Sequence, residues 1–349
     1  MPVITMMSSA ENVAGQGVGS AYREQLNLVN ERLNGIFDIR VNEQKYGEIT
    51  HYHTIDFRYY LHALFGRKKT YRVGYVHFIP ETLDGSLKLA KPVKIVFYRY
   101  LLKFYQEMDQ LVVVNPMFID KLVALGFDRN KITYIPNYVS DVTFHRQSAE
   151  DIAATKAKYG LDPDRFTVLG VGQVQTRKGV LDFIEVAKML PHIQFVWAGG
   201  FSFGKITAGY EELKEAMENC PSNVKFLGII QRDDMNAVYN AADVMFLPSY
   251  AELFPMTILE SMAIGVPILL RDLDLYENIL FDYYMKGTSN EMFRDELIRL
   301  SEDADYYEAY RQKSLEGKKF YSKQSVGTMW ERFYSSLLEK EVYEQKTVY

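Results

Sequence analysis

The chain has 349 residues, of which 48% are hydrophobic and 24% charged, and its formal net charge is -5 at pH 7. This length suffices for two ordinary α/β domains, and no run of about 18 uncharged apolar residues predicts a transmembrane helix. The acidic balance and the lack of a recognition module argue against nucleic-acid binding, and the single cysteine, Cys220, excludes an intramolecular disulfide and a cysteine-based zinc cluster.

The N-terminal segment predicts a β-strand followed by a glycine-rich loop. Residues 1–7 lack the basic region of a signal peptide, so a first strand and a cytoplasmic location are expected. The glycines of residues 15–19 could begin a dinucleotide fingerprint, but the pattern is incomplete and no acidic residue follows a second strand at the required position. A nicotinamide-dependent enzyme is therefore disfavoured.

Polar residues follow the next predicted strands. His51 and His53 have one residue between them, Asp56 comes shortly after, and His77 follows the apolar segment 74–76. Two histidines at this spacing could bind a metal ion, but no third ligand at a suitable spacing is evident, so no metal site is predicted. A strand-end histidine such as His77 is compatible with a structural role as well as with a role in a site.

Residues 58–104 carry ten basic residues and only two acidic ones. A helix is predicted from Pro92, with one apolar face at helical spacing that consists of Val93, Val96, Phe97, Tyr100, Leu101 and Phe104. Two interpretations remain open: the helix packs on a sheet with a solvated basic rim, or it rests on anionic lipid, where each basic residue contributes about 1 kcal/mol. The second makes candidate membrane contacts of Lys91, Lys94, Arg99 and Lys103.

A strand at 132–135 is followed by the polar stretch 140–163, which is expected to be a linker. The predicted domains are therefore residues 1–145 and residues 160–324. The second domain opens with an apolar strand that runs into Gly172 and then into Arg177 and Lys178 at the start of a helix. A guanidinium fork and an ammonium point charge both suit a diphosphate, although such a basic pair is also common in surface turns.

Two glutamates with seven residues between them follow the apolar run 244–247, which predicts a buried parallel strand. A helix is predicted to begin near Pro255, which places Glu252 in a loop and Glu260 on the helix. Ligands bind at this edge of an open α/β sheet, and a helix start suits a phosphate. The two carboxylates could then accept hydrogen bonds from hydroxyls on either side of that phosphate, as in a nucleotide sugar; glutamates at this spacing also occur on ordinary solvated helices.

Residues 166–267 together resemble the family-4 retaining glycosyltransferases of the GT-B fold. The resemblance implies an α/β fold with two facing Rossmann-like domains and a cleft between them. It also implies that Glu260 contacts the ribose, that Glu252 contacts the donor sugar, and that Arg177 and Lys178 bind the diphosphate. The remaining donor-binding residues are expected to be Gly17, Gly19, Gly172, Phe254, Pro255, Met256 and Thr257.

The same resemblance implies that His77 lies near the acceptor and the donor sugar, with His53 and Asp56 on the acceptor side. It further implies that the departing phosphate helps take the acceptor proton, so that no side-chain base is required. No Asp-x-Asp motif suited to a nucleotide-bound metal occurs at a strand end, so we expect Arg177, Lys178 and a helix dipole to meet the charge of the leaving group without a cofactor or a metal ion. The C-terminal helix, residues 325–349, is expected to pack back on the first domain.

Residues 7–22 and 53–56 are similar to bacterial glycolipid synthases that add a second hexose to monoglucosyl-diacylglycerol. This similarity implies transfer of glucose or galactose from UDP-glucose or UDP-galactose, by an enzyme bound peripherally to an anionic membrane surface at the cytoplasmic face. Two alternatives remain: a transferase for a soluble or cell-wall glycan acceptor, and a non-catalytic GT-B subunit that binds a protein partner.

Overall fold

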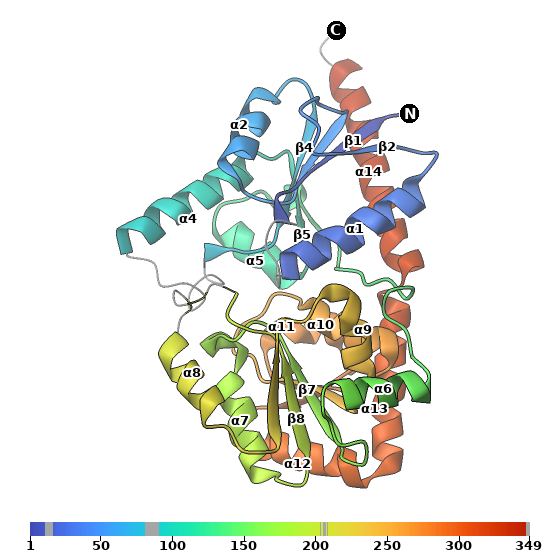
Figure 1. The fold of residues 1–349 in the computed structure, drawn as a ribbon. Coiled ribbons are helices and arrows are strands. Elements are labelled where there is room, and N and C mark those ends of the chain that lie inside the picture. Colours follow the sequence, from blue (N-terminus) through green and yellow to red (C-terminus); the bar gives the residue numbers. More distant parts are fainter. Residues whose placement is uncertain (11–16, 81–90, 203, 205–206, 208, 347–349) are drawn as a thin grey trace. The chain divides into compact units, whose positions relative to one another are not determined.

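The computed structural model describes residues 1–10, 17–80, 91–202, 204, 207 and 209–346 (Figure 1). Within these residues the chain forms two compact units. Unit 1 is built from the part of the chain before Val139 and the part from Tyr321 onward, and unit 2 from residues 139–320. Each unit has its own parallel sheet and its own hydrophobic core.

Unit 1 contains a six-stranded parallel sheet with the order β2-β1-β3-β4-β5-β6. Its central strands are short and largely buried, as is typical of a parallel sheet with helices on both faces. The strands are β1 (Val3–Met7), β2 (Asp38–Val41), β3 (Ile49–Tyr52), β4 (Tyr71–Val76), β5 (Gln110–Val113) and β6 (Ile132–Tyr134). The helices are α1 (Gly17–Leu33), α2 (Phe57–Phe65), α4 (Lys91–Gln106), α5 (Met117–Ala124) and α14 (Lys323–Lys346).

Helix α14 belongs to unit 1 although it ends the described chain. It lies beside α1, the first helix, with an ion pair of 2.9 Å between Arg32 and Glu331 (Figure 1). Trp330 and Tyr334 are fully buried, and the Tyr334 hydroxyl lies 2.7 Å from Nδ1 of His51 on β3. The last helix thus contributes to the core formed by the first strands.

Unit 2 contains a second six-stranded parallel sheet with the order β12-β11-β10-β7-β8-β9. Numbered within the unit, this is the strand order of a doubly wound Rossmann fold. The strands are β7 (Thr167–Val171), β8 (Gln194–Ala198), β9 (Val224–Gly228), β10 (Val244–Leu247), β11 (Ile268–Arg271) and β12 (Met285–Gly287). The helices are α6 (Ala149–Lys158), α7 (Val180–Met189), α8 (Tyr210–Glu218), α9 (Arg232–Asn240), α10 (Met256–Ile264), α11 (Asp274–Leu280), α12 (Asn290–Glu302) and α13 (Ala304–Phe320).

Helix α6 lies inside the stretch that was expected to be a polar linker. Ser148 caps it by accepting a hydrogen bond from the backbone N–H of Asp151, and only Thr155 of the helix is buried. A helix that is polar on nearly all sides gives no apolar periodicity, which explains why the sequence pattern did not reveal it.

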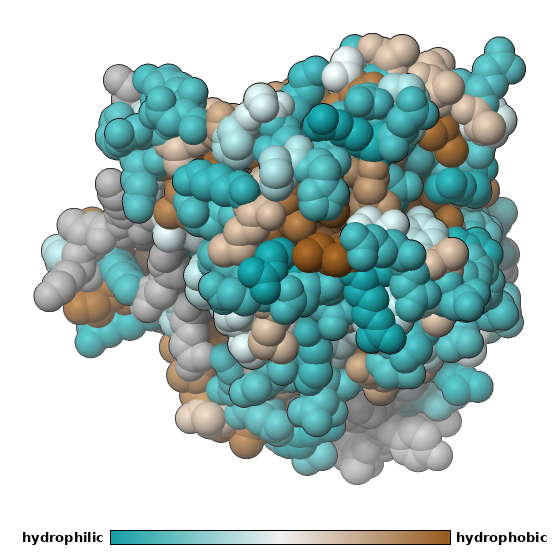
Figure 2. All heavy atoms as spheres, turned by 90° about the horizontal axis from the view of Figure 1, so that it is seen from below, coloured by the Kyte–Doolittle hydropathy of each residue, from teal (hydrophilic) through white to brown (hydrophobic). Residues whose placement is uncertain are grey.

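Seen from below Figure 1, the face in view is mostly hydrophilic, and its apolar residues form small separate groups (Figure 2). None of the described helices is both long enough and apolar enough to cross a membrane.

Candidate functional site

The predicted basic pair and the predicted glutamate loop meet at one edge of the unit 2 sheet. Strands β7 and β10 are hydrogen-bonded neighbours, with Val168 opposite Val244, and they stand where the strand order reverses direction. Ligands bind at such a switch point, outside the carboxyl ends of the strands. The chain leaving β7 carries Arg177 and Lys178, and the chain leaving β10 carries Glu252.

Arg177, Lys178 and Glu252 form a buried charge cluster. The Lys178 ammonium donates a hydrogen bond to Oε1 of Glu252, and Nη1 of Arg177 lies 3.8 Å from Oε2. Lys178 is 9% exposed and Glu252 is 8% exposed. Two cations and one carboxylate leave an excess positive charge at the edge of the sheet, which suits an anionic ligand.

The protonation of this cluster follows from its burial and its charges. Burial alone raises the pKa of the Glu252 carboxyl, but the charges of Lys178 and Arg177 and the Lys178 hydrogen bond outweigh it, so this pKa lies below its ordinary value. Glu252 is therefore ionised at neutral pH and can accept hydrogen bonds from hydroxyl groups.

Two glycines shape the segment that carries the basic pair, and one of them permits its close approach to the end of β10. Gly179 has φ +69°, and a Cβ there would lie 2.3 Å from the carbonyl oxygen of Pro248 at the end of β10. Gly172 has φ +149°, a region that favours glycine. A side chain at Gly179 would push apart the segments that bring Lys178 to Glu252, whereas a Cβ at Gly172 would lie 3.6 Å or more from its neighbours, so its cost would lie in the backbone conformation alone.

The glutamate loop is held by residues that the sequence pattern did not single out. Arg271 on β11 donates to the carbonyl oxygen of Pro248 (3.0 Å), is ion-paired with Asp182 of α7 (3.2 Å), and lies 4.0 Å from the ring centroid of Tyr250. The Tyr250 hydroxyl donates to Asp182 at 2.9 Å. These contacts join parts of the chain up to 89 residues apart, so no local spacing could have predicted them.

Glu260 lies one turn into α10, as predicted, and both of its oxygens have a protein partner. Arg232 donates to Oε1 at 2.9 Å, and the Tyr239 hydroxyl donates to Oε2 at 2.6 Å. Glu260 is 4% exposed. Arg232 and Tyr239 come from α9 and were not predicted as site residues.

The segment between the glutamates forms the start of α10. Pro255 stands at the N-cap position, with Phe254 and Met256 buried on either side of it. The Thr257 hydroxyl is buried and has no hydrogen-bond partner among the described residues. A helix start with backbone donors and such a hydroxyl is suited to phosphate.

In unit 1, the loops after β1 and β3 meet at one sheet edge. Asp56 accepts hydrogen bonds from Ser9 (2.6 Å) and Thr54 (2.5 Å). Gly17 begins α1, and a Cβ on Gly19 would lie 2.8 Å from the carbonyl oxygen of Ala10. Gly17 and Gly19 therefore lie in the first turn of α1 and not in a loop, and Gly19 packs against Ala10, next to the Ser9 that donates to Asp56.

His51, His53 and His77 form a buried stack with aromatic rings. His53 lies 4.2 Å from His51 and 5.1 Å from Tyr75, and His77 lies 4.4 Å from Tyr75, all measured between ring centroids. Burial lowers the pKa of His51 and His77 to about 3 and that of His53 well below its ordinary value. The surroundings of His53 and His51 are those of core residues, and all three imidazoles are neutral at pH 7.

Helix α4 divides into two halves. Leu101, Phe104 and Tyr105 are buried against unit 1, whereas Val93 and Val96 are exposed. The buried half thus packs as the first interpretation predicts, and contact of the exposed half with lipid stays a prediction. Arg99 and Lys103 are exposed, Lys94 is half-buried, and Lys91 is the first residue of the helix.

Among the residues that the structure describes, no three His, Cys, Asp or Glu side chains are grouped so as to hold a metal ion.

The sequence of this chain is similar to known proteins. Residues 151–316 match the family described as glycosyl transferases group 1. The chain is 44% identical over 331 residues to an alpha-galactosylglucosyldiacylglycerol synthase of Streptococcus pneumoniae, which covers 95% of this chain and 88% of that protein. The chain belongs to the group 1 glycosyl transferases.

This glycosyltransferase is also 27% identical over 231 residues to a processive diacylglycerol alpha-glucosyltransferase of Acholeplasma laidlawii, covering 65% of this chain and 68% of that protein. Its family membership makes it an enzyme that uses a nucleotide-sugar donor, as predicted.

Solved structures with low identity share the fold. HepE of Anabaena, solved in complex with UDP-glucose, superposes with a TM-score of 0.76 at 12% identity, over 96% of this chain and all (100%) of that chain. Sucrose-phosphate synthase of Thermosynechococcus elongatus gives 0.76 at 14% identity, over 97% and 100%. The predicted α/β fold with two Rossmann-like halves, as in GT-B glycosyltransferases, is thereby confirmed.

Proposed function

We propose that this glycosyltransferase moves glucose or galactose from a UDP-sugar to monoglucosyl-diacylglycerol and forms a diglycosyl-diacylglycerol. The observation that carries the proposal is the meeting of Arg177, Lys178 and Glu252 at the switch point of the unit 2 sheet, with Glu260 on the adjoining helix. The lipid acceptor is supported by the name of the relative at 44% identity.

The donor residues divide the nucleotide sugar among them. Arg177 and Lys178 meet the diphosphate, together with the start of α10, and Glu260 accepts hydrogen bonds from the ribose. Glu252 is ionised because two cations lie beside it, and it accepts hydrogen bonds from the hydroxyls of the donor hexose. In this arrangement the two cations stabilise the transition state most strongly, because negative charge develops there on the leaving diphosphate.

The reaction breaks the bond between the anomeric carbon and the diphosphate oxygen, and the electron pair leaves with UDP. The acceptor hydroxyl oxygen forms the new bond to the same carbon, and its proton passes to the departing phosphate. Attack on the face from which UDP leaves retains the α configuration. His77, which is neutral at pH 7 because burial lowers its pKa to about 3, contributes hydrogen bonding and not positive charge.

The acceptor comes from a membrane, and unit 1 has a surface suited to one. Helix α2 exposes Phe57 (64%), Leu61 (37%) and Phe65 (68%), which are four residues apart and share one side of the helix. The N-terminal half of α4 also exposes apolar side chains, those of Val93, Ile95 and Val96. The two helices are in contact through the Tyr60 and Phe104 rings, 6.3 Å apart.

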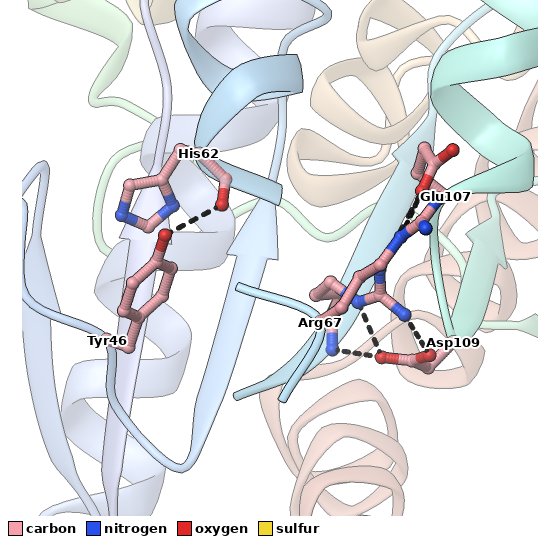
Figure 3. Close-up of polar contacts among 6 residues, drawn as sticks. Tyr46, His62, Arg67, Glu107 and Asp109 are labelled. Carbon is pink, nitrogen blue, oxygen red and sulfur yellow. Dashed lines mark hydrogen bonds and ion pairs between the residues drawn. The ribbon is translucent and has the colours of Figure 1, made fainter. Parts of the chain in front are cut away.

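Polar contacts hold this α2–α4 surface in place: one joins α2 to the loop that carries Tyr46, and one joins the ends of α2 and α4 to each other. The Tyr46 hydroxyl donates to the backbone oxygen of His62 on α2 (2.9 Å), and Nε of Arg67, just after α2, donates to Glu107, just after α4 (3.0 Å; Figure 3). Exposed apolar side chains on a fixed support, with basic residues nearby, are typical of peripheral attachment to anionic lipid.

The function is tested by transfer of radiolabelled hexose from UDP-glucose and from UDP-galactose to vesicles that contain monoglucosyl-diacylglycerol. We expect labelled diglycosyl lipid with one of the two donors. UDP binding without any lipid product, and transfer to a soluble glycan instead, would contradict the proposed acceptor. UDP binding with neither product would favour a non-catalytic subunit.

Membrane attachment is tested separately by co-sedimentation with anionic and neutral vesicles. Replacing Phe57 and Phe65 by Ser, or Lys94, Arg99 and Lys103 by Gln, is expected to weaken binding to anionic vesicles and to leave UDP binding unchanged. The matched control is Val142→Ser, which removes an exposed apolar side chain (81%) from unit 2. Equal sedimentation of all variants would show that this surface does not bind lipid.

A further inference from the structure

We propose that Tyr239 and Arg232 are positioning residues that fix the carboxylate of Glu260, so that its remaining acceptor sites meet the two neighbouring hydroxyls of the donor ribose. This inference rests on the proposed contact between Glu260 and the ribose. It adds the residues that make this contact selective for a ribose with both hydroxyls.

The geometry assigns one partner to each oxygen of the carboxylate. The Tyr239 hydroxyl donates to Oε2 at 2.6 Å, and Nη1 of Arg232 donates to Oε1 at 2.9 Å. Tyr239 has no exposed surface (0%), and the Arg232 side chain is 15% exposed. Both donors are therefore confined, and the plane of the carboxylate is fixed by two bonds from one helix, α9.

The hydrogen-bonding capacity of the carboxylate is only half used by these partners. An ionised carboxylate has about four acceptor sites, and Tyr239 and Arg232 each occupy one. One site therefore remains on each oxygen. Two acceptor sites in one fixed plane match two hydroxyls on adjacent carbons, whereas a freely rotating carboxylate would lose conformational entropy on binding the same pair.

The two positioning residues are themselves supported by Phe144. Its ring meets the Tyr239 ring edge to face, with centroids 5.9 Å apart and planes at 75°, and the Arg232 guanidinium lies 5.1 Å from its centroid. Phe144 has no exposed surface (0%). This support comes from the segment before α6, so a part of unit 2 outside α9 and α10 helps to hold the two donors of Glu260 in place.

Selectivity follows from the same arrangement. A nucleotide that lacks the 2′-hydroxyl leaves one acceptor of a buried carboxylate without a partner, which a site built for hydrogen bonding penalises strongly. Without the Tyr239 hydroxyl, the Glu260 carboxylate can rotate and accept hydrogen bonds from other donors. The penalty for the missing hydroxyl then decreases.

The test measures the dissociation constants of UDP and of 2′-deoxy-UDP by calorimetry on the full chain. We expect wild type to bind 2′-deoxy-UDP at least about tenfold more weakly, the loss of one hydrogen bond to a charged group. The ratio of the two dissociation constants, that of 2′-deoxy-UDP over that of UDP, is expected to fall toward one in Tyr239→Phe and in Arg232→Lys. UDP itself should also bind these variants more weakly. A merely structural role would weaken both ligands equally and leave the ratio unchanged.

Two further variants make the outcomes distinct. Tyr306→Phe is the control: it removes a similar hydrogen bond of 2.7 Å, from the Tyr306 hydroxyl on α13 to Glu296 on α12. This variant should keep the wild-type ratio of dissociation constants. Glu260→Gln should lose the ratio; if it keeps the ratio, the proposed ribose contact of Glu260 is wrong. If Glu260→Gln loses the ratio but Tyr239→Phe and Arg232→Lys keep it, Glu260 retains its role and the positioning inference fails.

Discussion

Lys178 and Glu252 neutralise each other in a place where either charge alone would be costly. Both are at least nine-tenths buried, and removing one partner of a buried pair leaves an uncompensated charge. Each charge therefore holds the other in place at the proposed donor site. Substitutions here act on the charge of the site and on local stability together.

Lys178→Ala is expected to lower kcat with the UDP-sugar by about 10²–10³-fold, the effect of removing one preorganised group that stabilises developing negative charge. Steady-state kinetics at saturating donor measure this loss. Lys188→Ala is the control, because Lys188 forms only an exposed ion pair with Glu185 on α7. An unchanged kcat in Lys178→Ala would remove Lys178 from the site.

Gly179→Ala is expected to reduce both stability and turnover. The positive φ alone costs about 1–2 kcal/mol, and the Cβ would also lie 2.3 Å from the Pro248 carbonyl oxygen, so the glutamate loop must move. Gly126→Ala isolates the first effect, because Gly126 has φ +91° and no atom within 4 Å of the added Cβ. Equal losses in the free energy of unfolding and equal turnover in both variants would contradict the proposed role of this close approach.

At the scale of elements, the histidine and aromatic cluster joins β3 and β4 to α14. Tyr75 on β4 stacks against His53 and His77, and Trp330 of α14 lies 5.6 Å from His51, centroid to centroid. The cluster contains three imidazoles that are neutral in the folded state because burial lowers their pKa. Protonation of these side chains is thus linked to unfolding.

The stability of unit 1 is therefore expected to fall as the pH falls below about 6.5, the ordinary pKa of histidine. Between that pH and about 3, the folded pKa of His51 and His77, the unfolded chain binds up to three more protons. Three histidines limit this contribution to about 4 kcal/mol per pH unit. Denaturant unfolding of Trp197→Phe, followed by the fluorescence of Trp330, reports on unit 1. His53→Phe should reduce the dependence on pH; identical slopes with and without His53 would contradict the linkage.

Elements with a strong local signal could be predicted from the sequence, and those that depend on distant partners could not. The apolar run of β10 and Pro255 fix the strand, the loop and the start of α10, and so place Glu252 and Glu260. Helix α6 carries no apolar stripe and was assigned to a linker. The apolar face of α4 was recognised, but which half of it is buried depends on the sheet and on α2. The partners of Glu260, Arg232 and Tyr239, lie 28 and 21 residues before it, beyond any spacing rule.

At the scale of the whole molecule, unit 1 takes its core from both ends of the described chain. Trp330 is 1% exposed and lies against Tyr75 and Tyr334, with ring centroids 6.0 and 5.4 Å away. The N-terminal strands therefore depend on a helix that is distant along the chain, since Tyr75 and Trp330 are 255 residues apart.

Trp330→Ala is expected to lower the free energy of unfolding of unit 1 by about 3–5 kcal/mol, as for other large-to-small changes in a core. Thermal unfolding followed by circular dichroism measures this loss. UDP binding should be kept, because the residues proposed to hold the uridine diphosphate around Glu260 and Lys178 belong to unit 2. A stability equal to wild type would show that α14 contributes little to the core of unit 1.

The return of α14 to the first sheet also sets an order of events during synthesis. Domains made early usually fold before those made later, but unit 1 cannot acquire Trp330 and Tyr334 until unit 2 has been translated. The nascent sheet of unit 1 thus has an incomplete core while unit 2 is being synthesised. Unit 1, which carries the exposed apolar side chains of α2 and α4, consequently completes its core after unit 2 has been made, and it needs α14 to shield the interior of its sheet from aggregation.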